Sequence, residues 1–162
     1  MKPPPIIGNA RVLDYAMVGD AVFTGRLCLY VNEARLAAVP CLAIGESFDG
    51  DELFLLHCDE EWDVGGIQAW KKAEGRISSV EEVKSRAEKY YAGISSKWIK
   101  HDASIEEVEA YKASLINARR CSFCGRSMFD VDTLLESDAG ACICNLCVTR
   151  FYEELIAKRT RG

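Results

Sequence analysis

Long apolar runs are missing from this 162-residue sequence, and so is the apolar core of a signal peptide near its first residues. We therefore expect no membrane-spanning helix and a cytoplasmic location. The G-x-x-x-x-G-K-[ST] pattern of a phosphate-binding loop is also absent, which removes the commonest sign of an ATPase. Histidine is scarce, with two residues in the chain. Because no catalytic motif stands out, we do not expect an enzyme.

The sequence also lacks a net positive charge. The chain carries 20 lysine and arginine residues against 25 aspartate and glutamate residues, which gives a formal net charge of −5. Proteins that bind nucleic acids usually present a basic face, so this balance makes nucleic acid an unlikely partner. Hydrophobic residues make up 49% of the chain and charged residues 28%, which is enough apolar material for a folded core.

The first hundred residues contain short apolar segments separated by turns. Valine, leucine and aromatic residues favour strands, and Gly-Asp, Asn-Glu and Asp-Gly-Asp sequences between them favour turns. The expected strands are 10–19, 22–31, 35–44 and 53–58. Two capping boxes, one from Ser79 to Glu82 and one from Ser104 to Glu107, predict the starts of two helices. Apolar residues follow each box at helical spacing.

Two features of this region have competing interpretations. No lysine or arginine lies between Arg35 and Lys71, whereas eight aspartate and glutamate residues do. These acids could form a surface for a basic partner, but solvated turns beside a strand are the simpler interpretation. The adjacent His57 and Cys58 could suggest thiol catalysis, yet neighbouring side chains on a strand point to opposite faces. A cysteine buried in a core is the better interpretation.

Four of the eight cysteines form two C-x-x-C pairs, Cys121 with Cys124 and Cys144 with Cys147, separated by nineteen residues. Two such pairs at this distance are a strong zinc signature. Each turn points two sulfurs at one ion, and Gly125 permits the tight backbone after the first pair. Four thiolates leave no position for an activated water. We therefore expect one Zn²⁺ with a structural role.

The residues after the second pair predict how this segment folds. Apolar residues recur at helical spacing after Cys147, so the second pair lies at a helix N-terminus, where the helix dipole favours thiolates. A cysteine knuckle, a hairpin and this helix together make a treble-clef-like finger. Cys142 is either a spare thiol, which we favour, or an alternative ligand. A segment of about forty residues has too small a core to fold without the metal.

The segment 121–127, C-S-F-C-G-R-S, and the segment 143–148, I-C-N-L-C-V, together resemble the C4-type zinc finger of the ClpX unfoldase. The resemblance covers residues 117–158. It implies a small treble clef that dimerises, captures substrates and adaptor proteins, and performs no chemistry itself. In ClpX an ATPase follows the finger, whereas no phosphate-binding loop occurs here. The resemblance therefore implies a recognition module and not an unfoldase.

These observations predict an α+β protein of two units. Residues 1–115 form a small, mostly antiparallel sheet with one or two helices, and residues 117–162 form a treble-clef-like C4 zinc finger. We expect protein–protein recognition, by an adaptor or regulatory protein linked to bacterial proteolysis, with a protein partner or a second copy in a homodimer. So small a finger cannot bury all its apolar groups, and the candidate contacts are Phe123, Met128, Phe129 and Leu146.

The alternative is a nucleic-acid-binding regulator that uses the treble clef. From residue 117 on, the sequence has seven basic and six acidic residues. Four zinc-bound thiolates add further negative charge. Such a balance is not typical of a surface that binds phosphates.

Overall fold

The computed structural model describes residues 1–159, and the side chains of all of these except 117, 118 and 159. Contacts divide the chain into two compact units. The N-terminal unit comprises Met1–Val108, and the finger unit begins at Glu109. The boundary lies inside helix α2 (Ile105–Ala118). None of the described helices combines the length and the apolar character that a membrane crossing requires.

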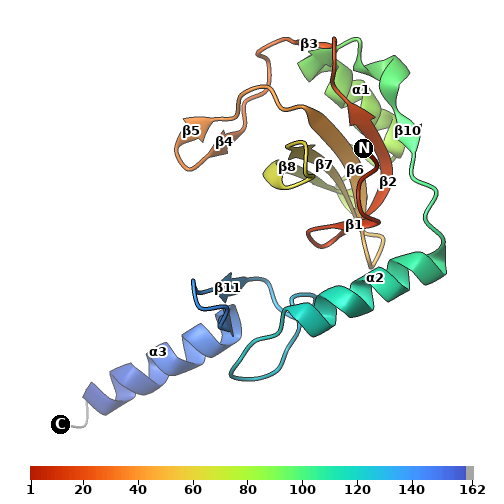
Figure 1. Ribbon diagram of the computed structural model, residues 1–162. Helices are drawn as coiled ribbons and strands as arrows, with labels where there is room; N and C mark the ends of the chain where they lie inside the picture. The colour runs from red at the N-terminus through yellow and green to blue at the C-terminus, as the bar shows by residue number, and fades with distance from the viewer. Residues whose placement is uncertain (160–162) are drawn as a thin grey trace. The chain divides into compact units, whose positions relative to one another are not determined.

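The N-terminal unit is built on one antiparallel sheet with the strand order β1-β2-β6-β7-β8 (Figure 1). A short strand, β10, also pairs with β2. The strands are β1 (Ile6–Ile7), β2 (Ala10–Met17), β6 (Cys41–Ser47), β7 (Glu52–Cys58), β8 (Val64–Lys71) and β10 (Ile99–Lys100). Because β1 and β10 pair with different parts of β2, residues from both ends of the N-terminal unit are fixed to the same strand.

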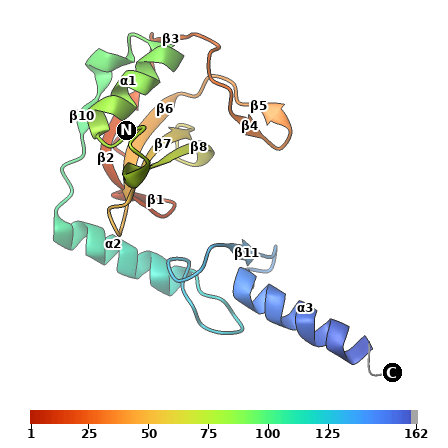
Figure 2. The ribbon, with the colours of Figure 1, turned by 180° about the vertical axis from the view of Figure 1, so that it is seen from behind.

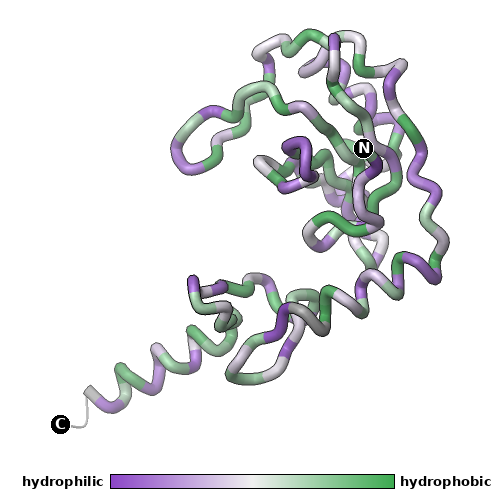
Figure 3. Tube along the Cα trace, viewed as in Figure 1, coloured by the Kyte–Doolittle hydropathy of each residue, from purple (hydrophilic) through white to green (hydrophobic). Residues whose placement is uncertain are grey.

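Smaller elements surround this sheet. Strand β3 (Val22–Phe23) pairs with β9 (Tyr91–Ala92), and β4 (Tyr30–Val31) pairs with β5 (Ala34–Arg35). The two residues between β4 and β5 have positive φ angles, 49° at Asn32 and 67° at Glu33, as tight hairpin turns require. Figures 1 and 2 show this hairpin extending from the sheet as an arm, and Figure 3 shows that its tip is hydrophilic.

One face of the sheet is covered by helix α1 (Val80–Tyr90), which Figure 2 shows in front of the strands. Val83 and Ala87 of α1 are fully buried against leucine and isoleucine side chains of β6 and β7. Two 3₁₀ turns, η1 (Lys72–Glu74) and η2 (Ile94–Lys97), lie on either side of α1 in the sequence. The predicted capping box is confirmed, since Ser79 and Glu82 each accept a backbone N–H bond from the other.

Strand alternation sends the other set of side chains to the opposite face of the sheet. This second core contains Cys41, Ala43, Leu56, Cys58 and Trp62, all at most 4% exposed. The ring of Trp62 meets that of Tyr15 edge to face, with 5.8 Å between the ring centroids. The sheet therefore has apolar layers on both faces.

Several predicted strands differ from those of the structure. The prediction of one strand over 22–31 is wrong for residues 24–29, which are irregular and separate β3 from β4. The predicted strand 35–44 begins too early, because residues 36–40 are irregular and β6 starts at Cys41. Pro40, directly before it, has no N–H to donate to a neighbouring strand. Strand β8 was not predicted, because its two adjacent glycines weaken the strand signal. Its pairing with β7 overrides this local preference.

The finger unit contains the rest of α2, a cysteine knuckle, strands β11 (Leu134–Glu136) and β12 (Cys142–Cys144), and helix α3 (Asn145–Arg159). The two strands form an antiparallel hairpin in which Leu134 pairs with Cys144. Helix α3 begins at the residue after β12. A knuckle, a hairpin and a helix in this order confirm the predicted α+β class with a treble-clef-like finger.

Candidate metal centre

The first cysteine pair is held by a closed backbone turn. The N–H of Cys121 donates to the carbonyl of Arg126 at 2.8 Å, and the N–H of Gly125 donates to the carbonyl of Cys121 at 2.9 Å. Gly125 has a φ of 73°, in the left-handed region that favours glycine. Ser127 pairs with Arg120 and closes the base of the knuckle. The turn thus presents the sulfurs of Cys121 and Cys124 on one side.

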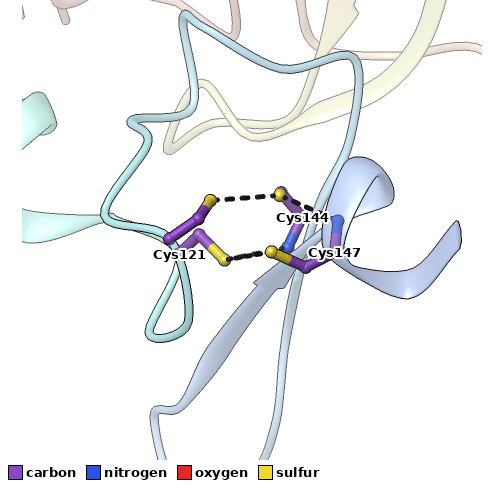
Figure 4. A group of neighbouring side chains, drawn as sticks. Cys121, Cys144 and Cys147 are labelled. Carbon is purple, nitrogen blue, oxygen red and sulfur yellow. Dashed lines mark hydrogen bonds between the residues drawn. The ribbon is translucent and has the colours of Figure 1, made fainter. Parts of the chain in front are cut away.

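The second pair is presented where strand β12 becomes helix α3. Cys144 ends the strand, and Cys147 lies in the first turn of the helix. The N–H of Asn145 donates to the carbonyl of Thr133 at 3.0 Å, which ties the start of α3 to the hairpin. Figure 4 shows the side chains of Cys121, Cys144 and Cys147 pointing toward one another.

The four predicted ligands converge on one point. Their sulfur atoms all lie within 4.8 Å of one another. Cys121 Sγ is 3.7 Å from Cys147 Sγ, and Cys124 Sγ is 3.6 Å from Cys144 Sγ. A tetrahedron with Zn–S bonds of about 2.3 Å has edges of about 3.8 Å. These separations match that tetrahedron and exceed the ~2.05 Å of a disulfide. The four cysteines therefore form a C4 zinc-binding site.

Backbone N–H groups point at the sulfurs and stabilise negative charge on them. The N–H of Cys144 donates to Cys121 Sγ, and that of Cys147 donates to Cys144 Sγ, both at 3.4 Å. Burial opposes ionisation of Cys121, but N–H bonds from Phe123, Cys124 and Cys144 outweigh it and lower its pKa to about 6. Hydrogen bonds of this kind orient thiolate ligands and adjust how strongly they bind a metal.

The raised pKa of Cys147 indicates that a bound metal ion would have to supply positive charge at this position. Burial, followed by the three neighbouring sulfurs, raises the pKa of Cys147 to about 12. A thiolate at this position needs a positive charge beside it, and Zn²⁺ would provide that charge. With all four positions filled by sulfur, these residues would hold the ion for a structural purpose.

Cys142 lies close by but outside the four-sulfur group. It is buried, and its sulfur lies 4.0 Å from the carbonyl of Gly140. Its N–H donates to Ser122 Oγ at 3.0 Å, which connects the hairpin to the first knuckle. The structure thus places Cys142 as a supporting residue of the hairpin.

The predicted contact residues lie at different depths. Phe123 is 60% exposed and Leu146 is 46% exposed, whereas Met128 and Phe129 are half-buried. The ring of Phe123 meets that of Phe151 edge to face, with 5.3 Å between the centroids. Lys112 places its ammonium 5.5 Å from the centroid of the Phe129 ring. The four residues therefore do not form one set of equally exposed side chains.

The candidate list also missed apolar residues on α3. Val148, Tyr152 and Leu155 are 41%, 65% and 61% exposed. Their spacing was visible in the sequence as an amphipathic pattern, which is typical of a helix packed on its own domain. In the structure, Phe151 of α3 packs with Cys147 in the apolar group around the cysteines.

His57 and Cys58 do not form a site. Both are fully buried on opposite faces of β7, with His57 beside Tyr91 and Cys58 in the second core. His101 is also buried, and it holds the residues that precede β1. Its Nδ1 accepts from the N–H of Ala103 at 3.2 Å, so Nε2 carries the proton and donates to the carbonyl of Pro3 at 3.2 Å.

Comparison with known families agrees with this geometry. Residues 119–156 match the ClpX C4-type zinc finger family, which confirms the resemblance for this segment. Searches of curated proteins and of solved structures gave no significant match. The family match covers the cysteine knuckle, the hairpin and most of α3, and the N-terminal unit lies outside it.

Proposed function

We propose that this protein recognises other proteins, and that its zinc finger is a recognition and assembly module. One observation carries the proposal: Val148, Tyr152 and Leu155 of α3 are exposed apolar residues at positions i, i+4 and i+7. This spacing places them on one side of the helix, and we call them the α3 stripe. Figure 3 shows hydrophobic residues among hydrophilic ones along α3. Grouped apolar exposure is typical of interaction sites.

The zinc site supports a structural role for the metal. Four sulfurs fill a tetrahedral shell and leave no position for a water or a substrate. The ion therefore fixes the orientation of α3 relative to the knuckle and so presents the α3 stripe. In this proposal the finger performs no chemistry of its own.

The family match supports an adaptor or regulatory role linked to proteolysis, because the matched family is named for a protein-unfolding machine. This part of the proposal rests on family analogy. Thiolate ligands require a reducing environment, which favours the cytoplasm.

We propose a second copy of the chain as the partner of the α3 stripe. Apolar residues at i, i+4 and i+7 are the spacing with which two helices pack in a bundle or coiled coil. Phe123, whose exposed ring packs against Phe151 beside the stripe, would extend the contact. Leu146 lies on the other side of α3, because it precedes Val148 by two residues. A homodimer would bury the α3 stripe and Phe123 without any further protein.

Sedimentation of the zinc-loaded full chain tests this proposal. We expect a dimer for the unchanged protein and a monomer for Leu155→Glu. Leu155 is 61% exposed, so a charge there costs little in folding but opposes burial in an interface. Thr149→Glu is the matched control, because it adds the same charge at an exposed position of α3 outside the α3 stripe. One zinc per chain should remain bound in all three proteins.

Two results would overturn the proposal. A monomer for the unchanged chain at high protein concentration would remove self-association. Equal dimerisation of Leu155→Glu and the unchanged chain would remove the α3 stripe as its cause. A gel shift with duplex and single-stranded DNA, repeated at rising salt, tests nucleic-acid binding. Tight binding that weakens steeply with salt would favour the nucleic-acid alternative.

A further inference from the structure

A second apolar surface lies in the N-terminal unit, on the face of the sheet opposite α1. A cavity of about 460 Å³ opens there between the β1–β2 hairpin and β8. Its apolar lining is contributed by Ile7, Ala10, Phe54, Leu56, Val64 and Ile67. Ile67 is 49% exposed and Val64 is 37% exposed. We call this cavity and the adjoining strand β8 the β8 groove.

Strand β8 forms one end of the sheet. In the described part of the chain, the strand order ends at β8, with β7 as its hydrogen-bonded neighbour. Natural sheets usually protect such an edge with lysine, proline or an inward-facing charge. β8 has no proline, and its one charged residue is Lys71 at its last position, so Val64 to Trp70 lack these protective features. The backbone of this strand is therefore suited to pair with another extended chain.

The β4–β5 arm contacts β8 but contributes no residue to the lining of the cavity. Its flanking residues Leu29 and Leu36 lie over Gly66, where a β-carbon would approach each of them to 2.8 Å. Gly66 pairs with His57, so this contact is on the α1 face. The side chains of Val64 and Ile67 point to the other face, together with Leu56 and Cys58.

Acidic residues lie at both ends of β8. Glu52 pairs with Lys71 and Cys58 pairs with Val64, so the β6–β7 turn and the β7–β8 loop lie at opposite ends of the strand. The turn contains two exposed acids and the loop contains four: Asp49, Asp51, Asp59, Glu60, Glu61 and Asp63. Residues 36–70 contain no lysine or arginine, so nothing within this range offsets the four acids of the loop. Lys71 and Lys72 lie at the turn end, where Lys72 pairs with Glu46, so the loop is the more acidic of the two ends.

We propose that the β8 groove binds an extended, basic segment of a partner protein, which adds to the sheet as a strand beside β8. Alternate apolar side chains of the segment would enter the cavity beside Ile67, and lysine or arginine residues at its two ends would face the acidic turn and loop. This surface belongs to a different unit from the α3 stripe, and the inference does not depend on the function proposed for the finger.

The charges argue against a second copy as the occupant of this groove. Two β8 strands paired antiparallel about a two-fold axis would bring the acidic loop of one copy against the acidic turn of the other. Like charges placed together oppose association. A basic segment reverses this interaction at both ends of the strand.

Fluorescence anisotropy on the zinc-loaded full chain tests the proposal. The probe is a labelled peptide, Lys-Arg-Val-Thr-Val-Thr-Val-Arg-Lys, and its comparator has glutamate and aspartate in place of the four basic residues. We expect the basic peptide to bind at least about tenfold more tightly than the acidic one, with an affinity that falls as salt rises.

Two pairs of variants locate the binding. Ile67→Lys should weaken binding of the basic peptide at least about tenfold, whereas Val22→Lys, at another exposed strand position, should not. The double variant Glu60→Gln/Glu61→Gln, in the acidic loop, should weaken binding mainly at low salt. The double variant Glu33→Gln/Glu106→Gln, which removes the same charge at exposed positions outside the acidic loop and turn, should not. The charge variants decide the question if Ile67→Lys fails to fold.

Three results would overturn the inference: no saturable binding, equal binding of the acidic and basic peptides, or equal losses in a variant and its control. A dimer of the full chain that Ile67→Lys dissociates would also overturn it, because the occupant would then be a second copy.

Discussion

The two units of this protein are stabilised by different means. The N-terminal unit buries leucine, isoleucine and valine on one face of a sheet and a second apolar layer on the other. In the finger, the buried cluster consists of Cys121, Cys144 and Cys147, with four partly buried apolar side chains packed against it. The comparison indicates that the sheet holds its fold by apolar packing, whereas the finger depends on its ion.

The positions of the tryptophans allow this comparison to be tested directly. All three, Trp62, Trp70 and Trp98, lie in the N-terminal unit. Tryptophan fluorescence therefore reports unfolding of the sheet, while zinc content and amide exchange of residues 119–156 report on the finger. Each prediction below changes one unit and follows both.

The largest effect should come from a ligand cysteine. Cys147→Ser should release the zinc and abolish amide protection across residues 119–156, since structural zinc contributes roughly 10–16 kcal/mol to such modules. Tryptophan fluorescence and the unfolding midpoint of the sheet should not change. Hydrogen exchange followed by mass spectrometry measures both units at once.

Cys142→Ser is the matched control for this prediction. Cys142 is also buried in the finger but lies outside the four-sulfur group, so one zinc should remain bound. If Cys147→Ser retained the zinc through Cys142, the ligand set would be wrong. If the sheet unfolded with the finger, the two units would not be independently stabilised.

Replacing a buried leucine of the sheet should destabilise the sheet and leave the zinc bound. Leu55→Ala removes a fully buried side chain from the α1 face and should lower the free energy of unfolding of the sheet by about 2–5 kcal/mol. Zinc content should stay at one ion per chain. Urea denaturation followed by tryptophan fluorescence measures the change, with the exposed Val22→Ala as the control. Loss of zinc in Leu55→Ala would show that the finger depends on the sheet.

The difference between the units also explains what could be predicted from the sequence. The zinc ligands could be identified because a metal needs few donors, and the spacing of Cys121, Cys124, Cys144 and Cys147 records their geometry locally. Both capping boxes were readable for the same reason, since their hydrogen bonds join residues three apart.

Features that depend on distant pairing were not predictable. Strand β8 has Gly65 and Gly66 in its first half, and it forms a strand because its backbone pairs with β7. The apolar residues of α3 predicted the helix but not which of them would be exposed, since burial depends on how much surface the small hairpin offers. The sequence shows the acidic residues of the turn and of the loop, but their positions at the two ends of β8 follow from the register of β7 and β8.

A titration of His57 should affect the sheet alone. Burial lowers the pKa of His57 from 6.5 to about 4 in the folded protein. The unfolded chain therefore binds more protons between these values, so His57 lowers stability as pH falls from 6.5 toward 4. At pH 5 the loss relative to pH 7 should be about 2 kcal/mol.

His57→Leu isolates this contribution. The variant should lose less stability than the unchanged protein between pH 7 and pH 5, as measured by urea denaturation and tryptophan fluorescence. Carboxylates with lowered pKa values, such as Glu82 and Glu88, destabilise both proteins alike in acid. Identical pH profiles for the two proteins would show that the pKa of His57 does not differ between the folded and the unfolded chain.

The smallest effect should come from the helix caps, and it should differ between the two helices. Ser79 caps α1, whose Val83 and Ala87 are buried in the sheet core, so Ser79→Ala should lower the free energy of unfolding of the sheet by about 1 kcal/mol. Ser104 accepts the N–H of Glu107 in the same way, but beyond Val108 its helix belongs to the finger unit. Ser104→Ala should therefore change the tryptophan-monitored unfolding less than Ser79→Ala does. Equal losses would mean that α2 contributes as much to the sheet as α1, and that the two units unfold together.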